Sequence, residues 1–208
     1  MVFVKICGIT NLEDALTAVD AGADALGFNF YPRSPRFIAP EEARLIIEQL
    51  PEAVMSVGVF VNEGEPEQVA QIARLARLKA VQLHGDESPE YCRRLRERFI
   101  VIKALRVGES FTPESVREYD ADAILLDAFA SGVRGGTGRV VDWSIARQVR
   151  ELVPQLYLAG GLSVENVAEA IAIVEPYAVD ACSHLEREPG RKDAGRVRAF
   201  IAASRVKP

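Results

Sequence analysis

The chain has few of the residues that bind metal ions or form disulfides. Its 208 residues include three cysteines and two histidines. Cys7, Cys92 and Cys182 lie too far apart in the sequence for a disulfide framework or a zinc-binding motif. With only His84 and His184 beside them, a metal ion would find few ligands. We therefore expect neither a disulfide-stabilised fold nor a bound metal.

The chain also lacks long apolar runs, a surplus of basic residues and any low-complexity tract. No apolar run approaches the roughly 20 residues of a membrane span. The sequence opens directly on a strand pattern, without the basic and apolar stretches of a secretory signal. Its net charge of −5 argues against nucleic acid or an anionic membrane as the general partner. We expect one compact domain over residues 1–208, located in the cytoplasm, with neither of these partners.

What the chain does contain is a repeated pair of elements, an apolar strand pattern followed by an amphipathic helix pattern. The pairs recur at intervals of roughly 20 to 30 residues, which is typical of βα units. The strand patterns lie at residues 2–6, 25–30, 54–61, 80–83, 100–105, 123–126, 156–159 and 178–180.

Several helix starts are marked in the sequence. Asn11, Ser163 and Asp193 can cap helices, and Pro40 and Pro66 suit a first helical turn. Eight strand–helix pairs predict an α/β protein with the (β/α)₈ TIM-barrel fold. The alternative is a doubly wound open sheet, but such sheets normally have fewer strands. The first strand-to-helix turn also lacks a G-x-G-x-x-G fingerprint.

Two strand patterns end on side chains that can move protons. Side chains alternate between the faces of a strand, so Lys5 and Cys7 share one face, and Leu125 and Asp127 share one face of the sixth strand. In a closed parallel barrel, Cys7 and Asp127 would point inward at the same mouth. Taken alone, a cysteine is often a small buried hydrophobe, and an aspartate is often a helix cap. Together, an acid and a base facing each other across a pocket suit an isomerase.

Other polar residues are interpreted as supporting the fold. Lys5 is expected to pair with a buried acid below Cys7, and Lys103 is a similar interior candidate. His84, Trp143 and Tyr177 are interpreted as packing residues or as residues behind the site.

Two segments near the C-terminus can bind an anion. Gly160 and Gly161 follow the seventh strand, where glycines allow the backbone to approach a ligand and a helix starting near Ser163 offers N–H groups. Ser183 follows the eighth strand and adds a hydroxyl. In TIM barrels these two loops commonly hold phosphate. Gly160-Gly161 also fits a simple tight turn.

Two further loops carry functional candidates. Gly135, Gly136, Thr137 and Gly138 follow the sixth strand without the Gly-Lys-Ser/Thr ending of a P-loop, which favours a lid that closes over substrate. The loop after the second strand carries Arg33 and Arg36 between prolines, and either guanidinium could bind a carboxylate. Strand parity does not choose between them.

Taken in order, seven motifs closely resemble one family over the length of the chain. They are VKICGIT (4–10), GFNFYPRSPR (27–36), VGVF (57–60), QLHGDE (82–87), LD (126–127), GGTG (135–138) and LAGGL (158–162). The family is phosphoribosylanthranilate isomerase, the small barrel of tryptophan biosynthesis.

The resemblance implies an Amadori rearrangement of N-(5-phosphoribosyl)anthranilate to 1-(2-carboxyphenylamino)-1-deoxyribulose 5-phosphate. Asp127 would be the general acid that opens the ribose ring, and Cys7, as a thiolate, the general base. Arg36 would bind the anthranilate carboxylate. The remaining substrate-binding residues would be Gly160, Gly161, Asp180 and Ser183. No cofactor is implied, the only partner is a small phosphorylated substrate, and the chain is expected to be a monomer or a homodimer.

One segment departs from the family pattern. The family usually reads Asp-x-Ser-Ser-Gly-Val-Glu after the eighth strand, and residues 180–186 here read DACSHLE. His184 stands in place of a glycine, and it would be strained if that position requires a positive φ.

Two alternative functions remain. A related sugar isomerase of histidine biosynthesis has an aspartate at the position of Cys7 and a second phosphate site, for which no glycine-rich loop appears in the first half of the chain. A barrel that binds phosphorylated metabolites without catalysis would keep Gly160 and Gly161. It would not need both Cys7 and Asp127 facing inward.

Overall fold

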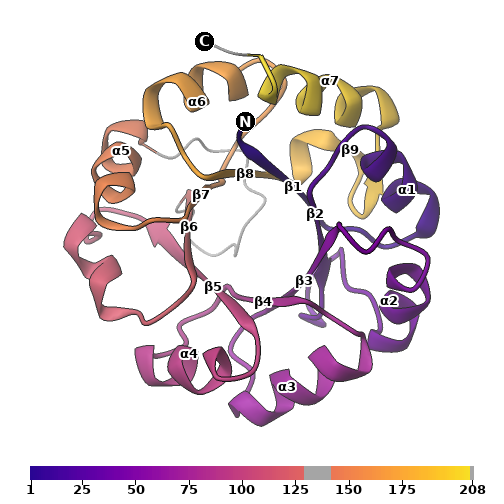
Figure 1. Cartoon of the computed structure of the whole chain (residues 1–208), viewed down its shortest axis with the longest axis horizontal. Helices are drawn as coiled ribbons and strands as arrows, with labels where there is room; N and C mark the ends of the chain where they lie inside the picture. The colour runs from indigo at the N-terminus through magenta and orange to yellow at the C-terminus, as the bar shows by residue number, and fades with distance from the viewer. Residues whose placement is uncertain (129–141, 207–208) are drawn as a thin grey trace.

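Eight parallel strands close into a barrel in the computed structural model, which describes residues 1–128 and 142–206 (Figure 1). The strands follow one another around the ring in sequence order, and the last pairs with the first. This closure confirms the predicted barrel and excludes the open sheet. The strands are β1 (Phe3–Cys7), β2 (Ala25–Asn29), β3 (Met55–Phe60), β4 (Ala80–Leu83), β5 (Ile100–Val107), β6 (Ala123–Ala128), β7 (Leu156–Leu158) and β8 (Ala178–Ala181).

The α-helices form an outer ring around the strands, as Figure 1 shows. None of the helices in the described part of the chain is long and apolar enough to cross a membrane. The helices are α1 (Leu12–Asp20), α2 (Pro40–Ile47), α3 (Pro66–Leu75), α4 (Pro89–Arg96), α5 (Trp143–Leu152), α6 (Val167–Val174) and α7 (Ala194–Ser204).

Most of the predicted helix starts are confirmed. Pro40 and Pro66 are the first residues of α2 and α3, where a missing N–H costs no intrahelical bond. The side chains of Asn11 and Asp193 accept hydrogen bonds from the backbone N–H groups of the first turns of α1 and α7. These four residues therefore set where their helices begin.

The predicted cap at Ser163 is wrong, because α6 begins later, at Val167. The amide of Asn166 accepts from the backbone N–H of Ser163 at 2.8 Å and donates to the carbonyl of Gly161 at 3.0 Å. These bonds hold the preceding residues in a turn before the helix starts.

Two connections differ from a regular strand–helix alternation. Between β5 and β6 the chain forms a short 3₁₀ helix, η1 (Pro113–Glu118). Between β8 and α7 it forms a 3₁₀ turn, η2 (Ser183–Leu185), and a small antiparallel hairpin of β9 (Glu186–Glu188) and β10 (Arg191–Lys192). The hairpin lies beside β1 and α1 at the edge of the barrel mouth (Figure 1).

The barrel wall separates two apolar layers. The larger layer lies between the strands and the helices, and the smaller one fills the barrel. Phe3 packs against the inner layer, so the predicted inward face of β1 is confirmed. The inner layer consists of Ala25, Val57, Ala80, Ile102, Ala104, Ala123, Leu125, Tyr157, Ala159 and Ala178.

Lys103 is buried, as predicted, but on the opposite side of the wall. Its neighbours on β5, Ile102 and Ala104, face the barrel interior, so Lys103 points toward the helices. There it pairs with Glu87 at 2.7 Å. It therefore belongs to the outer layer and not to the barrel interior.

Candidate active site

Cys7 and Asp127 lie at the same end of the barrel, where the carboxyl ends of all eight strands meet. Cys7 is the last residue of β1, and Asp127 is the second-last residue of β6. His84, one residue after β4, links the two electrostatically, because it contacts Asp127 and its charge acts on Cys7. The predicted meeting of the thiol and the carboxylate at one mouth is therefore what the fold produces.

The surroundings of Cys7 favour its thiolate. The thiol of Cys182 hydrogen-bonds to Cys7, and this bond with the charges of Lys5 and Lys192 holds the pKa of Cys7 well below its usual range, against the effect of burial. Gly27 pairs with Cys7 across β1 and β2, and a Cβ there would lie 2.7 Å from the Cys7 sulfur. Glycine at this position therefore leaves room for the sulfur.

Below Cys7, a buried ion pair fills the barrel centre. Lys5 Nζ lies 2.8 Å from Asp180 Oδ2 on the neighbouring strand β8, and both side chains are buried. Burial raises the pKa of Asp180 to about 7, although Lys5 acts in the opposite direction. The other oxygen of Asp180, Oδ1, is buried and has no hydrogen-bond partner among the residues that the structure describes. Asp180, expected to bind substrate, is thus the partner predicted for Lys5.

On the opposite side of the mouth, three polar side chains form a chain of contacts. Gln82 Nε2 lies 2.8 Å from His84 Nδ1, and His84 Nε2 lies 3.1 Å from Asp127 Oδ2. Gln82 is buried, and within residues 1–128 and 142–206 its oxygen Oε1 has no hydrogen-bond partner. His84 was expected to lie behind the site or in packing, and it proves to contact the candidate acid directly.

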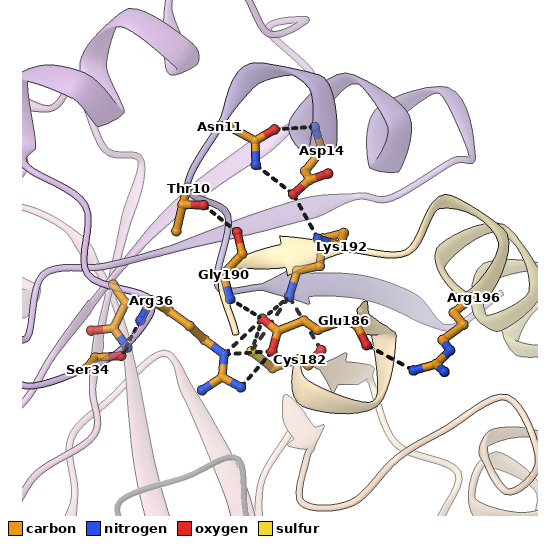
Figure 2. Close-up of polar contacts among 11 residues, drawn as sticks. Thr10, Asn11, Asp14, Ser34, Arg36, Cys182, Glu186, Gly190, Lys192 and Arg196 are labelled. Carbon is orange, nitrogen blue, oxygen red and sulfur yellow. Dashed lines mark hydrogen bonds and ion pairs between the residues drawn. The ribbon is translucent and has the colours of Figure 1, made fainter. Parts of the chain in front are cut away.

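The arginine at the mouth is Arg36, whereas Arg33 is exposed. The guanidinium of Arg36 binds the buried carboxylate of Glu186 through Nε at 2.9 Å and Nη2 at 2.6 Å (Figure 2). Gly8 has a φ of +78°, and a Cβ there would lie 2.8 Å from Arg36 Cδ, so only glycine fits. Of the two arginines that strand parity could not separate, Arg36 is the one held at the mouth by Glu186, and its role in binding substrate stays a prediction.

Glu186 also holds a second cation. Lys192 Nζ donates to Glu186 Oε1 at 2.9 Å and lies 3.8 Å from Cys182 Sγ (Figure 2). Burial alone would raise the pKa of Glu186, but the hydrogen bonds from Arg36 and the charge of Lys192 place it below its usual value. One buried carboxylate thus lies between two cations, which leaves the group of three with a net positive charge.

The hairpin that supplies these residues is tied to the start of the chain. Figure 2 shows Thr10 donating to the carbonyl of Gly190, and Asp14 Oδ2 accepts from the backbone N–H of Lys192 at 2.8 Å. Asn11 in turn donates to Asp14 at 2.6 Å. Helix α1 therefore positions β10 and, through it, the ammonium of Lys192.

The candidate anion site lies where β7 and β8 end side by side. Gly160 and Gly161 have φ values of +78° and +72°, which side chains rarely adopt. Ser183 begins η2 after β8. His184, by contrast, does not have a positive φ, so the strain considered for it is absent. The change from glycine therefore leaves this backbone unstrained.

Gly135, Gly136, Thr137 and Gly138, the predicted lid, lie outside the described residues. Within residues 1–128 and 142–206, no group of three or more potential ligands could hold a metal ion. A cavity of about 490 Å³ opens at the opposite end of the barrel and contains none of the groups described above, being lined by Met1, Val2, Phe3, Gly22, Asp24, Tyr177 and Arg205.

Sequence reasoning missed the roles of Glu186 and Lys192, and it treated Cys182 only as a departure from a motif. Glu186 and Lys192 are six residues apart in an irregular segment, where neither helical nor strand spacing indicates which side chains meet. The signal that could have found Cys182 was parity, since it lies two residues after Asp180 and directly after the end of β8, where an extended chain would continue the same face.

Comparisons with known proteins agree over nearly the whole chain. The family described as N-(5'phosphoribosyl)anthranilate (PRA) isomerase matches residues 4–203. The N-(5'-phosphoribosyl)anthranilate isomerase of Trichlorobacter lovleyi is 55% identical over 97% of both chains, and that of Thermotoga maritima is 50% identical over 97% of both.

Solved structures give the same result. The chain superposes on the phosphoribosyl anthranilate isomerase of Thermotoga maritima with a TM-score of 0.90 and 48% identity, covering 98% of both chains. A structure of the same enzyme type in complex with reduced 1-(o-carboxyphenylamino)-1-deoxyribulose 5-phosphate gives a TM-score of 0.87 with 48% identity and 98% coverage of both. The chain belongs to the N-(5'-phosphoribosyl)anthranilate isomerase family of tryptophan biosynthesis.

Proposed function

We propose that Cys7 is the general base and Asp127 the general acid of an Amadori rearrangement of N-(5'-phosphoribosyl)anthranilate at this mouth. One observation carries the proposal. A cysteine whose pKa lies well below its usual range and an aspartate face the same mouth from different sides of the barrel. An isomerisation that moves a proton from one carbon to another requires such a pair.

In the first step, Asp127 donates a proton to the ring oxygen of the ribose. The bond from that oxygen to C1 breaks, the nitrogen lone pair forms a double bond to C1, and a protonated Schiff base results. The Cys7 thiolate then removes the proton from C2, which gives an enolamine. Loss of the O2 proton and protonation of C1 yield the ketone, so no atom is gained or lost overall.

Arg36 binds the anthranilate carboxylate in this proposal. Nε and Nη2 donate to Glu186, and Nη1 donates to none of the described residues. The guanidinium can therefore still donate to an anionic ligand through Nη1. The surplus positive charge of Arg36, Lys192 and Glu186 favours a negatively charged substrate group. A related structure contains a ligand with both a carboxyphenylamino group and a 5-phosphate, which supports this assignment.

The 5-phosphate occupies the site formed by Gly160, Gly161 and Ser183. Two consecutive glycines with positive φ expose backbone N–H groups, and those of Gly161 and Ser183 donate to none of the described residues. Asp180 does not touch the substrate in this proposal, and it acts on Cys7 by holding Lys5 below it. A monomer or homodimer and a cytoplasmic location remain predictions.

Steady-state kinetics of Cys7→Ser and Asp127→Asn test the proposal. The reaction is measured as the decay of anthranilate fluorescence with freshly prepared substrate. We expect kcat to fall about 10²- to 10⁴-fold in each, with little change in KM, because each change is nearly isosteric but removes a proton-transfer group. Cys92→Ala is the matched control, since burial raises the pKa of Cys92 to about 11 and it lies on α4, outside the barrel.

The control should keep kcat at the wild-type level. If Cys7→Ser retained more than a tenth of wild-type kcat, Cys7 would not be the base. If Asp127→Asn raised KM at unchanged kcat, Asp127 would be a binding residue instead.

A further inference from the structure

The contacts of His84 raise the question of how Asp127 keeps a proton to donate. A carboxyl group with an ordinary pKa of about 3.9 is ionised at neutral pH, whereas an imidazole with an ordinary pKa of about 6.5 still binds protons there. His84 Nε2 lies 3.1 Å from Asp127 Oδ2, close enough for a proton to pass between them. The imidazole of His84 is therefore close enough to donate a proton to Asp127.

Gln82 determines which protonation states of His84 the site can accept. With its amide nitrogen facing His84 Nδ1 at 2.8 Å, Gln82 donates to a neutral ring whose only proton is on Nε2. In this orientation the buried Gln82 Oε1 has no partner in the described part of the chain. Turning the amide by 180° brings Oε1 to Nδ1, where it can accept a proton from the ring and is no longer unpaired.

We propose that His84 is a positioning residue that returns a proton to Asp127 in each cycle, and that Gln82 stabilises the proton-loaded ring by turning its amide. This inference rests on the proposed role of Asp127 as the acid. The imidazolium transfers its Nε2 proton to Asp127 and becomes a neutral ring with its proton on Nδ1, bonded to Gln82 Oε1. Asp127 then donates to the ring oxygen of the substrate, and solvent reloads His84.

Charges on the surrounding strands act on this pair in both directions. Negative groups favour the proton-loaded ring, and positive groups oppose it. Cys7 on β1 and Asp180 on β8 interact electrostatically with His84, and Arg106 on β5 lies beside Asp127 and pairs with Asp86 after β4. Lys5 and Cys182 act one contact further away, through Asp180 and Cys7. Because Cys7 must lose a proton and the pair must keep one, their effects fall on opposite limbs of the pH–rate profile.

The test is the pH profile of kcat/KM for His84→Asn, Gln82→Met and Gln82→Glu beside the wild-type enzyme. Activity is lost as pH rises through the apparent pKa of the His84–Asp127 pair, so a change that stabilises the proton-loaded ring moves the alkaline limb upward. We expect His84→Asn to lower kcat at least tenfold at similar KM and to move this limb down by one pH unit or more. Gln82→Met should move it down by less, and Gln82→Glu, which only accepts from Nδ1, should move it up.

Histidine labelled with ¹⁵N gives an independent readout, because the chain has only two histidines. In Asp127→Asn the titration of His84 should move to lower pH, and in Gln82→Glu to higher pH. Opposite shifts from changes at Asp127 and at Gln82, which contact different nitrogens of the His84 ring, are not expected of a residue that only packs.

The inference would be overturned if the alkaline limbs of all three folded variants coincided with that of the wild-type enzyme. If Asp127→Asn is inactive while His84→Asn keeps the wild-type profile, this inference fails and the proposed acid stands. If Asp127→Asn keeps wild-type kcat, both fail together.

Discussion

Lys5 and Lys103 are buried on opposite sides of the same barrel wall, and each lies within 3 Å of a carboxylate. Outside the wall, Lys103 Nζ donates to Glu87 at 2.7 Å and to the carbonyl of Gly85 at 2.8 Å. Both oxygens of Glu87 also accept backbone N–H groups. Inside the wall, Lys5 contacts Asp180 and Cys7, and none of the described residues bonds to Asp180 Oδ1.

The difference separates a pair that stabilises the fold from one that serves the chemistry. A buried pair with every hydrogen bond made is stable and specific, and it has no reason to change protonation. Asp180, by contrast, has one oxygen without a partner among the described residues, its pKa is raised by burial, and it lies near Cys7. The incomplete pair is therefore the one directly below the mouth.

The largest effect is expected at the complete pair. Lys103→Met should lower the free energy of unfolding by about 3–5 kcal/mol, because it leaves the Glu87 carboxylate buried without its cation. The kcat of the folded fraction should not change. Urea unfolding and steady-state kinetics measure the two quantities, and the double variant Lys103→Met with Glu87→Leu is the control, which should recover much of the loss. A large fall in kcat at full folding would contradict the structural role of this pair.

A smaller and different effect is expected at the incomplete pair. Lys5→Met should move the acid limb of the pH profile of kcat/KM up by about one pH unit, because Lys5 helps to lower the pKa of Cys7. At pH values below that limb, kcat/KM should therefore fall roughly tenfold. Its stability cost at pH 6 should be smaller than that of Lys103→Met, since Asp180 can take up a proton when its cation is lost. Equal stability losses in the two variants with an unmoved acid limb would remove the distinction.

The last prediction concerns the pH dependence of stability, which appears as a slope and not as a single difference. The pKa of Asp180 is about 7 in the folded chain and about 3.9 in an unfolded one, so between these values the folded state holds a proton that the unfolded state has lost. The contribution of Asp180 to the free energy of unfolding is therefore full below pH 4 and falls as pH rises to 7, by up to about 1.4 kcal/mol per unit. Asp180→Asn should abolish this slope. Parallel curves for the two proteins from pH 4 to 7 would show that Asp180 titrates normally.

The parts of the site that lie on regular strands could be predicted from sequence. The two-residue period of a strand was enough to place Lys5, Cys7 and Asp127 on the inner face, because the barrel leaves each strand only two faces. The interior placement of Lys103 was wrong, because the same rule puts Lys103 on the face of β5 opposite to Ile102 and Ala104. These errors and successes have one cause, which is that a strand fixes the direction of a side chain.

The parts that lie in irregular segments could not be derived in this way. Arg36 and Arg33 sit in one loop, and the choice between them depends on Glu186, which is 150 residues away from Arg36. The start of α6 depends on side-chain bonds of Asn166 with the backbone of Ser163 and Gly161, which hold this segment in a turn before the helix. Pairings between loops follow from tertiary contacts, which local periodicity does not contain.

The ties between the two ends of the chain also bear on how the protein folds. Lys5 meets Asp180 across 175 residues, and Asp14 meets the backbone of Lys192 across 178. Such distant contacts form late, because the loop between them must close before they contribute any stability. Cys7 meets Cys182 and Lys192, which help to lower its pKa, only when β8 docks on β1. With Cys7 as the proposed base, a half-formed barrel is expected to be inactive, and the return of activity on refolding should report the closure of the ring.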